Sequence, residues 1–119
     1  MGQGFKDLLV WQKAYKFVLM IYQETKSFPK EELFGMTSQL RRAVVSVPAN
    51  IAEGHERQYR KEYVQFLSVA KGSLGEVETY LLLAKDFGYT ETIRFRELEA
   101  MRTEIAKMLR GLINSLKSL

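Results

Sequence analysis

Residues 63–84, YVQFLSVAKGSLGEVETYLLLA, carry the clearest helical pattern of the sequence. Their apolar side chains recur every three or four positions, which is the spacing of one face of an α-helix. The pattern ends before Gly88, a residue type that commonly follows a helix because it tolerates a left-handed backbone. A long amphipathic helix is therefore predicted, with this apolar face: Tyr63, Leu67, Ala70, Leu74, Val77, Leu81 and Ala84.

Three further segments show helical periodicity, and no segment shows the strict apolar–polar alternation of a strand. Because the connections between them are short, consecutive helices should run antiparallel. We predict an all-α protein, an antiparallel up-down-up-down four-helix bundle, formed by a single domain over residues 1–119. The three further segments span about residues 8–28, 31–54 (with a start between 31 and 36) and 91–119.

The first of these segments is apolar on more than one side, so its core face has to be chosen from the spacing. A set of residues with a 3-4-3-4-3 spacing is predicted to face the core, flanked by Val10, Ala14, Phe17 and Ile21. The predicted core stripe is Leu8, Trp11, Tyr15, Val18, Tyr22 and Thr25.

The composition excludes most catalytic chemistry. The chain has no cysteine and one histidine, His55, so thiolate metal sites and sites with two histidines are excluded. A di-iron bundle needs two Glu-x-x-His pairs, and Glu53 lies only two residues before His55. The glycines of residues 72–75 lie inside a helical pattern and lack the Gly-Lys-Ser/Thr ending of a phosphate-binding loop. We therefore expect no enzymatic activity and no cofactor.

Charge and hydropathy limit the possible partners. The longest apolar run, residues 17–22, is far shorter than the ~20 residues that a membrane span requires, so we expect a soluble cytoplasmic protein without membrane contact. The chain has 18 Lys and Arg against 14 Asp and Glu, a net charge of +4. This mild excess permits contact with nucleic acid without requiring it.

Two predicted helices carry small or apolar residues opposite their core stripes. Each glycine inside a helix costs about 1 kcal/mol relative to alanine, and a closely packed neighbouring helix would offset that cost. A closed homo-oligomer would bury these stripes; alternatively, a solvent-exposed surface simply tolerates them. The predicted subunit interface comprises Val45, Ala49 and Ala52 of the second helix and Ser68, Gly72, Gly75 and Thr79 of the third.

Polar residues also fall on or beside the core faces of the second and third helices. We predict a structural seam in which Arg42 pairs with Glu53 and Glu76, while Arg41 points outward. Asn50 is predicted to cap a backbone group at a kink caused by Pro48, which lacks an amide proton. The alternative is a ligand or RNA pocket. The seam comprises Arg42, Asn50, Glu53, Ser73 and Glu76.

A basic cluster with an aromatic residue, Tyr59, lies at the turn between the second and third helices. Cations beside an aromatic ring suit phosphate contact combined with base stacking. Glu56 and Glu62 dilute the charge, so a solvated turn is the alternative interpretation. The candidate nucleic-acid contacts are Arg57, Arg60 and Lys61, with Arg41 and Lys107 as second choices.

The order of motifs over residues 5–90 resembles a known family, the bacterial four-helix-bundle proteins encoded in intervening sequences of 23S ribosomal RNA genes. The fourth segment matches only in its apolar pattern. The motifs are Phe5-Lys6-Asp7-Leu8, Val10-Trp11-Gln12, Phe28-Pro29, Glu32, Phe34-Gly35, Ser38-Gln39-Leu40-Arg41-Arg42-Ala43, Ser46-Val47-Pro48-Ala49-Asn50-Ile51-Ala52-Glu53-Gly54, Phe66-Leu67, Ala70, Gly72-Ser73, Glu76 and Gly88-Tyr89.

That family is similar in turn to the accessory variability proteins of diversity-generating retroelements, which form basic, barrel-shaped homopentamers that bind nucleic acid and a reverse transcriptase. The resemblance implies a ring-like pentamer and RNA or DNA binding, without catalysis or a cofactor. One departure follows Gly54, where the family tends to read Tyr-Gly-Arg-Arg-Ser and this chain reads HERQY. The serine suited to cap the third helix is lost. The rival function is a protein-interaction scaffold.

Overall fold

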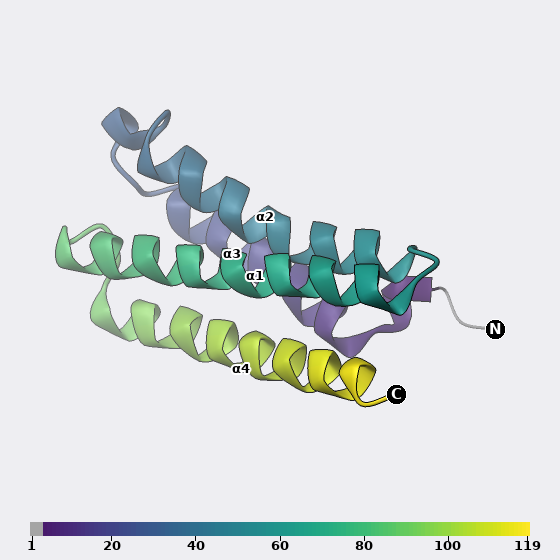
Figure 1. The fold of residues 1–119 in the computed structure, drawn as a ribbon. Helices are drawn as coiled ribbons and strands as arrows, with labels where there is room; N and C mark the ends of the chain where they lie inside the picture. Colours follow the sequence, from purple (N-terminus) through teal and green to yellow (C-terminus); the bar gives the residue numbers. More distant parts are fainter. Residues whose placement is uncertain (1–3) are drawn as a thin grey trace.

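The structure, a computed structural model, describes residues 4–119 and contains four α-helices in that range. Figure 1 shows them packed side by side in an elongated bundle, with η1 and the end of α4 at the same end. The elements are η1 (Gly4–Asp7), α1 (Leu9–Thr25), η2 (Lys30–Glu32), α2 (Met36–His55), α3 (Arg60–Asp86) and α4 (Thr92–Lys117), of which η1 and η2 are short 3-10 helices.

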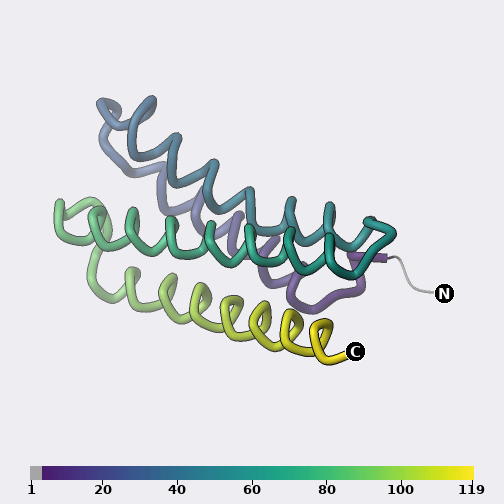
Figure 2. The backbone as a smooth tube through the Cα atoms, viewed as in Figure 1, coloured from purple at the N-terminus to yellow at the C-terminus, as the bar shows by residue number. Residues whose placement is uncertain are grey.

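Consecutive helices run in opposite directions, as Figure 2 shows. α2 packs on both α1 and α3, and α4 packs on both α3 and α1, so the helices enclose one core. The predicted all-α four-helix bundle is therefore confirmed. The prediction of a single domain includes residues 1–3, which lie outside the described residues.

The core consists of one apolar stripe from each helix. Along α3, the six residues of the predicted stripe from Leu67 to Ala84 are buried, and Tyr63 at its start is partly exposed. Each large aliphatic side chain buried in this way contributes about 1.5–3 kcal/mol. α3 stops where predicted: Gly88 has a φ of +82°, and the Tyr89 amide donates to the Ala84 carbonyl at 2.8 Å.

The predicted core stripe of α1 is wrong at its two tyrosines. Tyr15 and Tyr22 are 52% and 39% exposed. The flanking set faces the core instead, because its compact aliphatic and phenyl side chains have no polar group to keep in water, unlike a tyrosine hydroxyl. The buried residues of α1 are Val10, Ala14, Phe17, Ile21 and Thr25.

α2 continues through Pro48, which is buried inside the helix. Pro48 has no amide to donate to the carbonyl of Val44, and a missing bond of this kind bends a helix. Figure 2 shows α2 changing direction part-way along its length.

Gly54 sets the distance between α2 and α3 near the end of α2. It is buried, and a Cβ atom built on it would lie 2.7 Å from the Cβ atom of Phe66 and 3.2 Å from the carbonyl oxygen of Tyr63. Only a glycine lets the two backbones approach this closely. The contact fixes the position of the turn that follows, residues 56–59.

Candidate nucleic-acid interface

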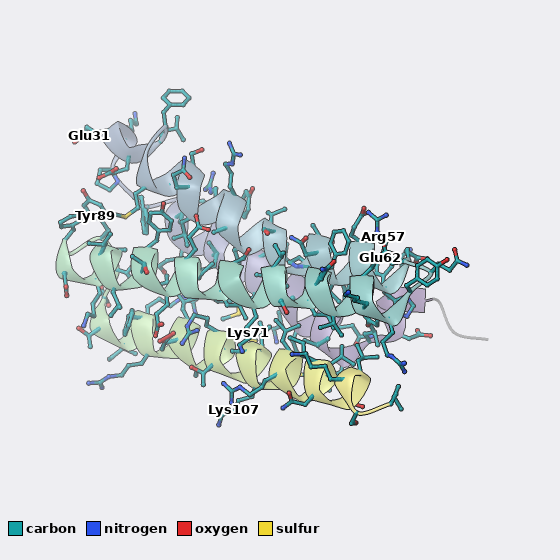
Figure 3. All side chains as sticks on the ribbon, viewed as in Figure 1. Glu31, Arg57, Glu62, Lys71, Tyr89 and Lys107 are labelled. Atoms are coloured by element: carbon teal, nitrogen blue, oxygen red, sulfur yellow. The ribbon has the colours of Figure 1, made fainter. Side chains whose placement is uncertain are left out.

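The turn between α2 and α3 holds three of the predicted cations at one end of the bundle. Arg57, Arg60 and Lys61 are all exposed, and Figure 3 shows Arg57 and Glu62 together at this end. The turn is short because α2 ends at His55 and α3 begins at Arg60. The fold therefore gathers these cations as the sequence predicted.

Arg57 is held by contacts within the protein. Its Nη2 atom donates to Oε1 of Glu53 at 2.8 Å, and its guanidinium lies over the ring of Phe66, 4.8 Å from the centroid. The two residues are four positions apart, about one helical turn, and the ion pair partly neutralises the charge of Arg57. Arg57 is thus less available to a ligand than its two neighbours.

Arg60 and Lys61 form no hydrogen bond or ion pair through their side chains with any residue of the range 4–119. They lie in the first turn of α3, where the helix dipole disfavours positive charge. The N-cap residue, Tyr59, makes no side-chain capping bond, in line with the missing serine. Neither cation is therefore paired with a carboxylate of the described residues.

Arg41 and Lys107 lie apart from this turn. The Nε atom of Arg41 donates to Oγ1 of Thr25 at 2.8 Å, and its guanidinium lies over the Tyr22 ring, 4.5 Å from the centroid. The prediction that Arg41 points outward is wrong, because it reaches across to the C-terminal end of α1, where a cation is favourable. Lys107 is exposed on the outer side of α4 (Figure 3).

The polar seam is centred on a residue that sequence reasoning missed, Ser46. The Nδ2 atom of Asn50 donates to the Ser46 carbonyl at 2.8 Å and to its Oγ at 2.9 Å. The Oγ atoms of Ser46 and Ser73 lie 2.8 Å apart, which links α2 to α3. The four-residue spacing between Ser46 and Asn50 is the signal that could have identified this member of the seam.

The predicted pairing of Arg42 with Glu53 and Glu76 is wrong. Arg42 and Glu53 are three turns apart on α2, about 16 Å along the axis, and Glu53 pairs with Arg57 instead. Arg42 and Glu76 line one polar cleft of about 220 Å³ between α2 and α3. Within residues 4–119, neither of their side chains forms an ion pair.

The predicted subunit-interface residues lie on the outside of the bundle, apart from Ala52, which is half-buried. A Cβ atom built on Gly72 or Gly75 would meet no atom within 4 Å. Nothing inside the protomer therefore requires these glycines. The other exposed members are Val45, Ala49, Ser68 and Thr79.

Sequence reasoning also missed an ionic link between α3 and α4. Nη2 of Arg102 donates to Oε2 of Glu78 at 3.0 Å and to Oε2 of Glu99 at 3.2 Å. The hydrogen bond between the two carboxyl groups, together with burial, raises the pKa of Glu78. The link joins two helices and offers no chemistry of its own.

The described residues offer neither a metal site nor a membrane span. No group of three or more His, Asp or Glu side chains in the range 4–119 could hold a metal ion. Among its helices, none has the length and apolarity needed to cross a membrane.

These features define a helical-bundle protein whose candidate nucleic-acid site is the turn between two of its helices, α2 and α3. The chain belongs to the 23S rRNA-intervening sequence protein family, because the model of that family matches residues 6–111. The resemblance seen over residues 5–90 is thereby confirmed, and the match extends into α4.

A solved structure is similar over most of the chain. It is a protein of unknown function from the S23 ribosomal protein family of Bacteroides thetaiotaomicron, with 27% sequence identity and a TM-score of 0.83. The alignment covers 88% of this chain and 98% of that one. No curated protein matches the chain.

Proposed function

We propose that this protein is a non-enzymatic homo-oligomer that binds RNA through a basic surface repeated around the assembly. The observation that carries the proposal is the pair of exposed cations, Arg60 and Lys61, which have no side-chain partner in the described residues. DNA shares the phosphate chemistry that these cations recognise. The contact would be to phosphates, with little sequence specificity and a steep dependence on salt.

Repetition matters because one protomer is only mildly basic. A net charge of +4 on 119 residues produces a modest field, whereas a closed ring would place one copy of the turn beside the next and add their potentials. The resemblance to the retroelement proteins implies five copies. A pentamer of this chain would carry a formal charge five times that of the protomer.

The outward faces of α2 and α3 support the oligomer. Gly72 and Gly75 are exposed and meet nothing inside the protomer, although each costs α3 about 1 kcal/mol relative to alanine. Val45 on α2 leaves an aliphatic side chain 40% exposed. A neighbouring helix packed on these faces would bury the aliphatic surface and use the close approach that glycine allows.

A lysine at Gly75 should break the assembly. The variant Gly75→Lys places a long charged side chain on the proposed interface, so the protein should sediment as a smaller species than the parent. Gly111→Lys is the matched control, because Gly111 is also an exposed helical glycine with nothing within 4 Å, and it should sediment like the parent. A monomeric parent, or a Gly75→Lys variant that stays assembled, would overturn the proposed interface.

A protein-interaction scaffold is the second candidate function. One observation favours it: Tyr15, Leu19 and Tyr22 form an exposed stripe along α1, with Leu19 58% exposed. Exposed apolar patches mark protein-binding surfaces. An oligomer that does not bind RNA would favour this function.

A further inference from the structure

Two adjoining grooves lie where α1 passes to α2, at the end of the bundle opposite the turn 56–59 (Figure 1). The larger has a volume of about 590 Å³ and is lined by Tyr22, Phe34 and Arg42, among others. Its lining includes Val45 of the proposed subunit interface, so the groove and that interface adjoin. The smaller, about 140 Å³, extends toward Lys26 and Lys30. Both share the side chains of Leu33, Thr37 and Arg41, so they form one continuous surface, the α1–α2 corner.

The α1–α2 corner is positively charged. Lys26, Lys30, Arg41 and Arg42 line it, and no carboxylate does. The Nζ atom of Lys26 reaches only the amide oxygen of Gln23, at 3.4 Å, and the Arg42 guanidinium has no partner in the described residues. The charge of these cations is therefore free to meet an anionic ligand.

The acidic residues nearby are engaged elsewhere or lie outside the two grooves, and Glu76 lines a separate polar cleft that it shares with Arg42. Oε2 of Glu32 accepts a hydrogen bond from the Tyr89 hydroxyl at 3.0 Å, and Oε1 accepts one from the Met36 amide at 3.2 Å. Glu24 pairs with Arg94, the two side chains being 3.3 Å apart. Glu31 is on η2, at this end of the bundle in Figure 3, and lines neither groove. The local excess of positive charge is thus larger than the composition suggests.

An exposed aromatic ring, that of Phe34, lines the larger groove together with Arg41 and Arg42. Phe34 is 92% exposed, more than any other large hydrophobic side chain in the range 4–119. It belongs to the connection between η2 and α2, so the rigid start of α2 holds it beside the larger groove. An exposed ring beside cations is the arrangement on which proteins stack unpaired nucleobases.

Thr37 lines both grooves, but its hydroxyl is buried beneath their surface. Thr37 is only 3% exposed, and its Oγ1 atom has no hydrogen-bond partner. Because Oγ1 itself is buried, a ligand in the grooves would meet the cations and Phe34 and not this hydroxyl.

We propose that the α1–α2 corner binds a single-stranded segment of RNA. One base stacks on Phe34, and the phosphates meet Arg42 and Lys30. Arg41 is a positioning residue, since its bond to Thr25 and its stacking on Tyr22 fix the wall between the grooves. The inference rests on the proposed RNA binding and specifies the form of RNA that is bound. An apolar protein segment would leave the four cations without anions.

The test compares three replacements of Phe34, which is too exposed to affect folding. Binding of a fluorescein-labelled 12-nucleotide uridine oligomer is measured by anisotropy at 0.1 M salt. Phe34→Ala and Phe34→Leu should each weaken binding, by about 5- to 150-fold if one stacked base is lost. Phe34→Trp should bind at least as tightly as the parent. Tyr15→Leu is the control, because it removes an exposed ring of α1 outside the grooves.

Each alternative outcome contradicts a different statement. If Phe34→Leu binds like the parent and only Phe34→Ala is weakened, the ring provides apolar contact and not base stacking, and the inference fails. If all Phe34 variants bind like the parent, the α1–α2 corner is not the site, although RNA binding itself stands. If the parent binds neither the uridine oligomer nor structured RNA, the proposed function fails and this inference with it.

Discussion

Reversing the charge of Arg60 and Lys61 together should weaken the binding of structured RNA by about 50-fold or more at 0.1 M salt. Each phosphate contact contributes about eightfold between 1 M and 0.1 M salt, because neutralising a phosphate releases a condensed counterion. Loss of two contacts should therefore also lower the slope of log affinity against log salt by about 2. A repeated turn multiplies both effects when several protomers contact one RNA.

The variant Arg60→Glu/Lys61→Glu should fold normally. Acidic residues are favourable in the first turn of a helix, and neither native side chain has a partner in the described residues that could be lost. Any loss of RNA binding would then result from the changed surface charge and not from unfolding. The midpoint of thermal unfolding should stay the same or rise.

The control makes the same change in net charge elsewhere. Lys16 on α1 and Arg110 on α4 are exposed and belong to other helices than those that flank the turn. The variant Lys16→Glu/Arg110→Glu should keep most of the affinity, measured by anisotropy at several salt concentrations. An equal loss in both double variants would mean that net charge alone governs binding, and the turn would lose its special role.

Gly54→Ala should lower the free energy of unfolding by about 1–3 kcal/mol, the usual cost of forcing a methyl group into a packed site. The added Cβ atom would lie 2.7 Å from the Cβ atom of Phe66 and 3.0 Å from Cδ1 of Tyr63. The Tyr63 carbonyl, 3.2 Å away, belongs to the backbone and cannot turn aside. α2 and α3 would have to separate, and the higher helix propensity of alanine, worth about 1 kcal/mol, offsets only part of the loss.

The matched control for this prediction is Gly111→Ala in α4. A Cβ atom at Gly111 meets nothing within 4 Å, so the variant should gain about 1 kcal/mol from helix propensity alone. Urea denaturation of both variants measures the difference. If Gly54→Ala were as stable as Gly111→Ala, the close approach of α2 and α3 at Gly54 would be contradicted.

Periodicity was sufficient to predict the bundle, because every helix buries a continuous apolar stripe and the connections are short. It failed on α1, which is apolar on two sides. There, the choice between Tyr22 and the adjacent Ile21 depends on which helices pack against α1. For the same reason, the orientations predicted for Arg41 and Arg42 were interchanged: Arg41 bonds to Thr25, and Arg42 has no partner in the described residues. Neighbours on one helix differ by about 100°, and only the position of α1 decides which of them finds a partner.

The candidate sites were predictable only in part. The cations of the turn between α2 and α3 are adjacent in sequence, so a short turn necessarily gathers them. The α1–α2 corner joins Tyr22, Phe34 and Arg42 from separate segments, and no local pattern brings these together. The unpaired hydroxyl of Thr37 is likewise a property of packing. Conversely, an expected pairing such as Arg42 with Glu53 fails because side-chain reach is shorter than three helical turns.

Sedimentation of the purified protein tests whether it is an RNA-binding homo-oligomer. The protein is sedimented with and without a structured RNA, at low and at high salt. We expect a particle several times the protomer mass of 13.8 kDa that carries RNA at low salt and releases it at high salt. A monomer, or an assembly that sediments identically with and without RNA at low salt, would contradict the proposed function.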